Sequence, residues 1–546
     1  MPSKANLESD PQAIPLPRLS YQTLEAQGYT GFLLRNAPVR VVQFGGGNFL
    51  RGFADAFIDL ANEKRDFDAK VLFIQSVTPG ASERINAQDG LYSLYLRGVE
   101  DGQIYKQKRI ISCVDRSLHP AQEFEEFLYA AENPHLRFII SNTTEAGIAW
   151  DPTAEFADRP PASFPAKLCR FLYQRWAHAG RETASGIVIL SCELIDDNGK
   201  VLEDYVHRHV QAWGLEEGFA EWLRKECLFC STLVDRIVTG YPHADATALH
   251  VENGYEDRLM VMGEPFALWV IEGPATLAAE LPFADMGLPV RVVPDHRPYK
   301  KQKVRILNGA HTTLVPVAYL RGLRIVRDCM TDTFAADFLR RAIWEEILPT
   351  LSLPADESAA FARAVEERFQ NPFIDHALLA ILMNSISKWR TRVLPTLKDY
   401  MREKGSVPPC LAQGLAAIIA LYGTAHRGSD GEIRAEWAGE TFALSDEPSV
   451  LAFFVQYGGE SAADLTRRVL SETAFWGEDL TQSAELLELA DYVAEAVAAI
   501  RAPGLPGRLS PSPGSKSPQP PMPPPACPNV AETELMVTLP NTVPPL

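Results

Sequence analysis

Short runs of β-branched and other apolar residues alternate with segments of helical periodicity through the first half of the chain. Such runs predict buried strands, because Val, Ile and Phe pack well in a sheet whose two faces are covered. They occur at residues 40–44, 70–76, 94–96, 109–114, 137–141 and 186–191. Apolar residues recur at helical spacing over residues 49–62, 121–132 and 166–179. This alternation predicts an α/β fold with a Rossmann-type, doubly wound parallel sheet.

From about residue 290 the strand pattern gives way to helices alone. The predicted helices cover residues 303–320, 333–347, 356–369, 376–394, 411–422, 447–457, 462–470 and 482–501. We therefore expect a lead-in over residues 1–37, a sheet domain over 38–290 and an α-helical domain over 291–501. The Pro-rich residues 502–546 have no apolar period, and we expect them to be disordered.

Composition and charge narrow the class of protein. The chain has 546 residues, of which 46% are hydrophobic, enough for two large cores. A net charge of -18 argues against a nucleic-acid partner. The N-terminus has no signal or transit pattern and no apolar run approaches membrane-spanning length, so we expect a cytoplasmic protein without a membrane partner.

Cysteine usage gives the expected redox compartment and bears on metal binding. Eight cysteines are scattered along the chain, which fits a reducing compartment better than a disulfide framework. The close pair Cys227 and Cys230 lacks the second pair of ligands that a structural zinc site needs. We therefore expect no metal.

A glycine-rich turn follows the first predicted strand. Gly45-Gly46-Gly47 leads from that strand into the helix predicted at 49–62. In a nucleotide-binding fold Gly45 permits the tight turn, Gly47 lets the backbone approach a pyrophosphate, and the helix N-terminus offers free N–H groups. The third glycine of G-x-G-x-x-G is replaced by Leu50, so an ordinary strand-to-helix turn is the alternative.

Two further strand ends point to the same edge of the sheet. After the second strand Gln75 and Ser76 stand where NAD-selective folds carry an acidic residue, and no Arg follows directly. The sequence at that position therefore leaves the choice between NAD and NADP open. After the strand at 137–141 comes Asn142-Thr143-Thr144-Glu145-Ala146-Gly147, which lies either at the cofactor edge or at a helix N-cap.

The stretch from Lys303 to His311 carries the strongest candidate chemistry. On a helix, Lys303, Asn308 and His311 can share one broad face, which then holds a cation, an amide and an imidazole. A lysine with a lowered pKa exchanges protons, while an amide and an imidazole polarise a carbonyl oxygen. This suits carbonyl–alcohol chemistry, although residues at this spacing also form ordinary solvated faces.

The pattern Lys-x4-Asn-x2-His on a largely apolar helix resembles the signature of the polyol-specific long-chain dehydrogenases, the mannitol dehydrogenase family. Gly45, Gly47, Phe49 and Arg51 also resemble the Gly-x-Gly-x-Phe-x-Arg segment of that family, and the likeness spans about residues 38–500. The resemblance implies NAD in one domain and Lys303 as general acid/base, with Asn308 and His311 holding the substrate oxygen. The cofactor residues that it implies are Gly45, Gly47, Asn48, Phe49, Leu50, Arg51, Thr143 and Glu145.

Departures from the polyol pattern favour a small-molecule sugar acid as substrate. Where the polyol enzymes carry an Asn after the strand at 186–191, this chain has Glu193-Leu194, and Lys300 replaces a Glu. A cation beside the site suits an anionic substrate. Lys388 matches a family lysine that reaches the substrate, although its segment also fits a solvated helix end.

A catalytically silent NAD-binding protein with the same fold is the alternative to an enzyme, and the presence of Lys303, Asn308 and His311 argues against it. The sequence leaves the oligomeric state undetermined.

Overall fold

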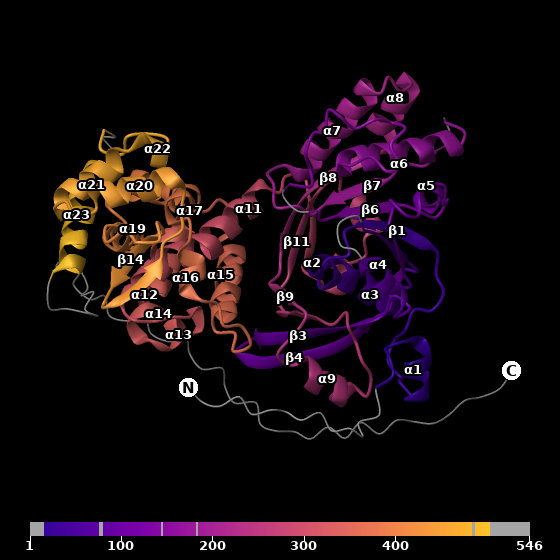
Figure 1. Ribbon diagram of the computed structural model, residues 1–546, viewed down its shortest axis with the longest axis horizontal. Coiled ribbons are helices and arrows are strands. Elements are labelled where there is room, and N and C mark those ends of the chain that lie inside the picture. The colour runs from indigo at the N-terminus through magenta and orange to yellow at the C-terminus, as the bar shows by residue number, and fades with distance from the viewer. Residues whose placement is uncertain (1–15, 76–79, 144–145, 182–183, 483–485, 503–546) are drawn as a thin grey trace. The chain divides into compact units, whose positions relative to one another are not determined.

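The computed structural model of the chain describes residues 16–75, 80–143, 146–181, 184–482 and 486–502. Its largest sheet has eight strands, and Figure 1 labels β11, β8, β7, β6 and β1 among them. In order across the sheet they are β12 (Val290–Val293), β11 (Leu268–Glu272), β8 (Leu228–Asp235), β7 (Val188–Ser191), β6 (Phe138–Ser141), β1 (Val39–Phe44), β2 (Lys70–Ile74) and β5 (Val114–Leu118). Each neighbouring pair is parallel apart from β11 with β8. The predicted Rossmann-type sheet is confirmed.

Helices cover both faces of this sheet, which explains why its strands are apolar on both sides. Val41 and Phe73 belong to one apolar layer, and their neighbours Val42 and Leu72 belong to the other. The first layer contains α3 (Ala54–Arg65) and α10 (Leu277–Glu280), and the second contains α5 (Phe124–Ala131), α6 (Phe164–His178), α7 (Asn198–Ala212) and α8 (Glu217–Glu226). The carboxyl ends of β1, β6, β7 and β8 therefore remain available at one edge.

One predicted strand belongs to a second sheet, and another is divided between the two sheets. A second, four-stranded sheet consists of β4 (Gln103–Ile111), β3 (Tyr92–Glu100), β10 (Val261–Gly263) and β9 (Val238–Gly240). The strand predicted at 94–96 is part of β3, and the one predicted at 109–114 is divided between β4 and β5. Ser112 lies at the division because its N–H donates to the Asp59 carboxylate at 2.8 Å instead of to a strand.

The helix predicted at 49–62 is also divided. A single turn, α2 (Asn48–Arg51), precedes α3, and Gly52 lies at the break. The carbonyl oxygen of Gly52 accepts a hydrogen bond of 2.7 Å from Nη1 of Arg236, so it takes no part in a continuous helix. The break depends on a residue 184 positions away, which sequence periodicity does not reveal.

The remainder of the chain is mainly helical, as predicted. Its helices are α11 (Arg297–Lys303), α12 (Ala310–Leu320), α13 (Val326–Thr331), α14 (Thr333–Arg341), α15 (Ala355–Phe369), α16 (Leu378–Leu382), α17 (Ser385–Arg392), α18 (Leu394–Lys404), α19 (Pro409–Tyr422), α20 (Pro448–Tyr457), α21 (Ala462–Ser471), α22 (Thr473–Trp476) and α23 (Leu487–Arg501). The nearly wholly buried α19 packs against both α12 and α23 (Figure 1). No described helix is both long enough and apolar enough to cross a membrane.

Several predicted helices have different boundaries. The helix predicted at 376–394 is two helices, α16 and α17, because Asn384 adopts a left-handed conformation with φ 56°. Residues 342–347, predicted as α-helix, form a π-helical turn after α14. A small sheet of β13 (His426–Arg427), β14 (Ile433–Trp437) and β15 (Glu440–Ala443) was not predicted, because its strands are short and largely polar.

Candidate functional site

The glycine turn after β1 leaves open space beside its backbone. Gly45 has φ +104°, a conformation that side chains disfavour, and a Cβ there would lie 3.0 Å from the Asn142 carbonyl oxygen. A Cβ on Gly47 would meet no protein atom within 4 Å. Gly47 is the N-cap residue of α2 and has no side chain to satisfy the first N–H groups of that helix. The turn can thus receive a ligand at close range.

The other predicted residues of this turn differ in what they can offer a ligand. Gly47 and Asn48 are exposed and Phe49 is partly exposed, whereas the Leu50 side chain is buried in the core. Arg51 is also buried, and it donates to the carbonyl oxygens of Gly46 at 3.1 Å and Leu259. Arg51 therefore holds the turn in place, and its predicted contact with a cofactor stays a prediction.

A buried glutamate joins the ends of β6 and β7. Glu193 accepts hydrogen bonds from the Ser141 hydroxyl at 3.1 Å and from the Thr143 N–H at 3.0 Å and hydroxyl at 3.1 Å. Burial raises the pKa of Glu193, and the hydrogen bonds from Thr143 and Ser141 oppose that rise. The described residues after Glu145 form turns and not a helix, and the alternative of a helix cap at Thr143 or Thr144 depends on residues outside that description. Glu145 itself, Thr144 and Ser76 lie outside the described residues.

These strand ends border a cavity of about 610 Å³, here called the first cavity. Its walls combine Phe49 after the glycine turn, Asn142 after β6, Leu194 after β7, Val234 and Asp235 at the end of β8, and Lys303. A cavity beyond the carboxyl ends of parallel strands is where doubly wound folds bind ligands. Phe49, which follows the predicted glycine turn, and the predicted Lys303 therefore line the same cavity.

Lys303 begins a wide helical turn. Residues Val304–Gly309 form a π-helical turn between α11 and α12, where the sequence predicted an α-helix starting at 303. A π turn closes on the fifth residue instead of the fourth. Lys303 and Asn308 are five residues apart, so this turn brings them nearer to the same side than an α-helix would. Turns of this kind are frequent at functional sites.

Asn308 and His311 each carry a buried polar atom without a partner. Oδ1 of Asn308 and Nε2 of His311 make no hydrogen bond within the described part of the chain. The His311 ring stacks on Phe369 with a centroid distance of 4.0 Å and meets His376 edge-on at 5.7 Å. Burial lowers the pKa of His311 well below its ordinary value, so the imidazole is neutral. Unpaired buried polar atoms are costly unless a ligand satisfies them.

The Lys303 ammonium lies at the end of strand β8, against a carbonyl oxygen and an acid of that strand. Its Nζ donates to the Val234 carbonyl oxygen at 2.9 Å and lies 3.7 Å from Oδ1 of Asp235. Burial lowers the pKa of Lys303, Asp235 opposes this effect, and the positive charge of Arg368 adds to it. The net pKa of Lys303 lies below its ordinary value, as an acid/base lysine requires.

A buried ion network behind Lys303 was missed by sequence reasoning. Arg368 donates two hydrogen bonds of 3.0 Å to the Asp235 carboxylate and a third of 3.0 Å to Glu264. Burial raises the pKa of Asp235, but Arg368 and Lys303 outweigh burial, so its net pKa is lowered. Arg368 and its neighbour Phe369 thus hold the partner of Lys303 and the ring of His311. The acid at the end of β8 was a possible signal for Asp235, whereas Arg368 looks like any polar residue of an amphipathic helix.

The two predicted substrate lysines have protein partners. Nζ of Lys300 forms an ion pair with Asp196, and Nζ of Lys388 donates to the Ile381 carbonyl oxygen at 2.8 Å. Burial lowers the pKa of Lys388, and the positive charge of Arg392 lowers it further. The charge of Lys388 is one of those that lower the pKa of His311, so the two side chains lie within electrostatic reach.

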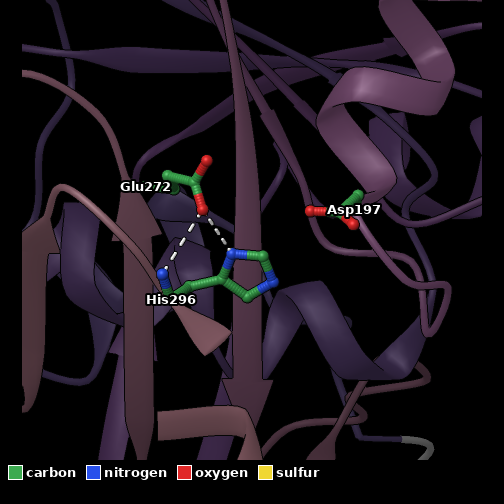
Figure 2. A group of neighbouring side chains, drawn as sticks. All are labelled: Asp197, Glu272 and His296. Atoms are coloured by element: carbon green, nitrogen blue, oxygen red, sulfur yellow. Dashed lines mark hydrogen bonds and ion pairs between the residues drawn. The ribbon is translucent and has the colours of Figure 1, made fainter. Parts of the chain in front are cut away.

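Asp197, Glu272 and His296 form a group with the residue types of a metal site, and their candidate ligand atoms lie within 4.8 Å of one another. Figure 2 shows Nδ1 and the backbone nitrogen of His296 directed at one Glu272 oxygen, with Asp197 across the imidazole ring. The ammonium of Lys200 lies 2.7 Å from Glu272 and 3.3 Å from Asp197. A protein cation thus already pairs with both carboxylates, and the group ties α7 and the start of α11 to β11.

Two family models together match most of the chain. The model described as mannitol dehydrogenase Rossmann domain matches residues 39–284, and the one described as mannitol dehydrogenase C-terminal domain matches residues 295–500. Altronate oxidoreductase of Yersinia enterocolitica is 45% identical over 85% of this chain and 95% of its own length. Altronate oxidoreductase of Pectobacterium carotovorum is 44% identical over 84% of this chain and 94% of its own.

Solved structures of similar fold are more distant in sequence. Mannitol 2-dehydrogenase of Pseudomonas fluorescens, solved with NAD and D-mannitol, has a TM-score of 0.62 at 21% identity. That likeness covers 89% of this chain and 97% of the other. A substrate-free D-sorbitol dehydrogenase has a TM-score of 0.69 at 21% identity, over 88% of this chain and 98% of its own. At this identity the likeness establishes the fold.

Proposed function

The chain belongs to the mannitol dehydrogenase family of oxidoreductases acting on CH–OH groups, and we propose that it interconverts D-tagaturonate and D-altronate with NAD as cofactor. Relatives named altronate oxidoreductase, which are 42–45% identical over most of the chain, support this choice of substrate. In the direction of reduction, the ketone of tagaturonate becomes the alcohol of altronate. The pathway that we propose for this reaction is the breakdown of hexuronates such as galacturonate.

One observation carries the proposal: a lysine with a lowered pKa lies in the first cavity, on the same helical segment as two unpaired buried polar atoms. Nζ of Lys303 donates to Val234 and lies 3.7 Å from Asp235, while Oδ1 of Asn308 and Nε2 of His311 lack a hydrogen-bond partner in the described chain. A substrate oxygen that accepts a hydrogen bond from His311 and exchanges a proton with Lys303 satisfies the imidazole, and Oδ1 of Asn308, an acceptor, is satisfied by a hydroxyl that donates to it.

The residues at the glycine turn fit a dinucleotide. Gly47 leaves space within 4 Å of its backbone, and Gly45 adopts the positive φ that the tight turn needs. Thr143 is held at the same edge by Glu193. When bound, the nicotinamide supplies the hydride for reduction and accepts it in oxidation. The preference for NAD over NADP is part of the proposal, and it rests on the absence of an Arg directly after β2.

Each residue then has a defined task. Protonated Lys303 gives its proton to the developing alkoxide, and neutral Lys303 accepts a proton from the alcohol in oxidation. The neutral His311 ring donates through Nε2 to the substrate oxygen, and the Asn308 amide lies beside it. Asp235, which Arg368 holds through two hydrogen bonds, pairs with the ammonium and raises its pKa, while the charge of Arg368 lowers that pKa.

The test is to follow NADH absorbance with tagaturonate, fructuronate and fructose offered separately, and to repeat the series with NADPH. We expect the highest kcat/KM for tagaturonate with NADH. A higher kcat/KM for fructuronate would move the assignment to mannonate formation, and one for fructose would move it to a mannitol-type enzyme. The absence of turnover with all three, although NADH binds, would favour a catalytically silent protein.

A further inference from the structure

A second cavity, of about 330 Å³, lies next to the first and is strongly charged. The two cavities are neighbours along the chain, since Leu194 and Lys303 line the first while Asp196 and Val304 line the second. Five cationic side chains of the second cavity are Arg297, Lys300, Lys301, Arg305 and Arg392. Such a cavity suits an anionic group on a substrate whose reacting end occupies the first cavity.

Four of these five cations already have acidic partners. Arg297 pairs with Asp295 at 2.7 Å, and Lys300 pairs with Asp196. Asp399 pairs with the remaining two, at 3.7 Å with Lys301 and at 2.6 Å with Arg305. Each of the four therefore already has an acidic partner within the protein, and Asp399 is shared by Lys301, Arg305 and Arg402.

Arg392, the last residue of α17, differs from them. Its guanidinium forms neither a hydrogen bond nor an ion pair with any residue in the described ranges, although the side chain is only partly exposed. Burial lowers the pKa of Arg392, yet a guanidinium remains charged in proteins. A partly buried charge without an acceptor is unfavourable, and a bound carboxylate would relieve this cost.

The position of Arg392 connects it with the residues that hold the substrate oxygen. A Cβ on Gly309, the neighbour of Asn308, would lie 3.2 Å from the Arg392 carbonyl oxygen, so the end of α17 packs directly on the π-helical turn. The charge of Arg392 also lowers the pKa of His311. Lys388 lies one turn earlier on the same helix and has a carbonyl oxygen as its partner, not an acid.

We propose that Arg392 is the residue that binds the carboxylate of the sugar acid, with Lys388 beside it, and that it sets the preference for acids over neutral ketoses. This inference rests on the proposed function and deepens it. It assigns the carboxylate to Arg392 in place of Lys300, because Lys300 is neutralised by Asp196. A guanidinium can bind a carboxylate through two parallel hydrogen bonds, which a lysine cannot.

The test compares Arg392→Gln and Arg392→Lys with Arg390→Gln as the matched control. Arg390 lies on the same helix, is partly exposed and does not line the second cavity. We expect Arg392→Gln to raise KM for tagaturonate about tenfold to a hundredfold with kcat changed little, while kcat/KM for fructose changes less than about twofold. Arg392→Lys restores part of the loss, and Arg390→Gln behaves as wild type.

The outcomes separate this inference from the function on which it rests. If wild type reduces tagaturonate and Arg392→Gln keeps the wild-type KM, the assignment to Arg392 is overturned and the function stands. Equal losses of kcat/KM on tagaturonate and fructose also overturn it, because they indicate a structural role. If wild type reduces fructuronate instead of tagaturonate, the same comparison of variants is made with fructuronate. A wild type that prefers fructose to both acids overturns the function and the inference together.

Discussion

Lys303 and Asp235 form an ion pair at the end of strand β8, with 3.7 Å between Nζ and Oδ1. Arg368 holds the same carboxylate through two hydrogen bonds of 3.0 Å. The lysine therefore shares its counter-ion with a permanent cation in a buried setting. This arrangement lets the ammonium exist in the site while its pKa stays below the ordinary value.

The first prediction concerns pH. Because protonated Lys303 is the proton donor in reduction, kcat for tagaturonate should fall as pH rises through the lowered pKa of Lys303, and kcat for altronate oxidation should rise over the same range. Asp235→Asn removes the negative charge that raises the pKa of Lys303. Both the fall in kcat for reduction and the rise in kcat for oxidation should therefore occur at lower pH. The measurement is kcat against pH in both directions, with the exposed Asp464→Asn as control. An Asp235→Asn variant whose kcat changes over the same pH range as that of wild type would exclude an effect of Asp235 on the pKa of Lys303.

A second prediction concerns stability. Arg368→Met removes the cation that pairs with the buried carboxylates of Asp235 and Glu264. We expect this to lower the free energy of unfolding by about 3–5 kcal/mol. Arg363→Met, on the exposed side of the same helix α15, should change it by less than about 0.5 kcal/mol. Urea unfolding of the three proteins at neutral pH measures both values. Similar unfolding midpoints for the two variants would contradict the importance of the network.

A third prediction tests the glycine turn. A Cβ on Gly47 meets no protein atom within 4 Å, so Gly47→Val should fold normally and fill the space left for a pyrophosphate. We expect the Kd for NADH to rise more than about tenfold, as read by protein fluorescence quenching. Gly459→Val is the matched control, because a Cβ on Gly459 also lies in open space. Wild-type NADH affinity in Gly47→Val would remove the phosphate site from this turn.

The fourth prediction concerns Glu193, which joins the ends of β6 and β7. Glu193→Ala removes the acceptor of three hydrogen bonds from Ser141 and Thr143, so the loop after β6 loses its anchor. An unpaired buried donor costs about 1–3 kcal/mol, and KM for NADH should therefore rise about fivefold or more. Glu193→Gln retains one acceptor oxygen and should have a smaller effect. Steady-state kinetics at saturating tagaturonate measure both variants, and an unchanged KM in Glu193→Ala would mean that the anchored loop does not support the cofactor.

Sequence patterns predicted the sheet and most helices, because these depend on local periodicity and burial. The strands at 70–76 and 137–141 are examples, since continuous apolar runs have few alternatives inside a covered sheet. The hairpin of β3 and β4 was placed in the wrong sheet, because pairing partners depend on residues far along the chain. The break at Gly52 has the same origin, since it depends on Arg236.

The candidate site was predicted only in part for similar reasons. Lys303, Asn308 and His311 were identified by their spacing, but the π-helical turn between the first and the second of them leaves no mark in the sequence. Arg368 pairs with Asp235 across 133 residues, and no local pattern distinguishes that arginine from a solvated one. The partners of Lys300 and Lys388 could not be predicted from the sequence either. Tertiary contacts therefore determine which positively charged side chain is left to bind a substrate.

The most direct test of the account is the transfer of deuterium from NADH, labelled in its transferable position, to tagaturonate, followed by mass spectrometry of the altronate formed. Wild type should place the label on the carbon that carried the ketone. Lys303→Ala should transfer it about a hundredfold to ten-thousandfold more slowly while binding NADH with nearly wild-type affinity, because the lysine serves proton transfer and the cofactor lies at the glycine turn. Label transfer by Lys303→Ala at more than about a tenth of the wild-type rate, or label absent from the altronate made by wild type, would contradict the account.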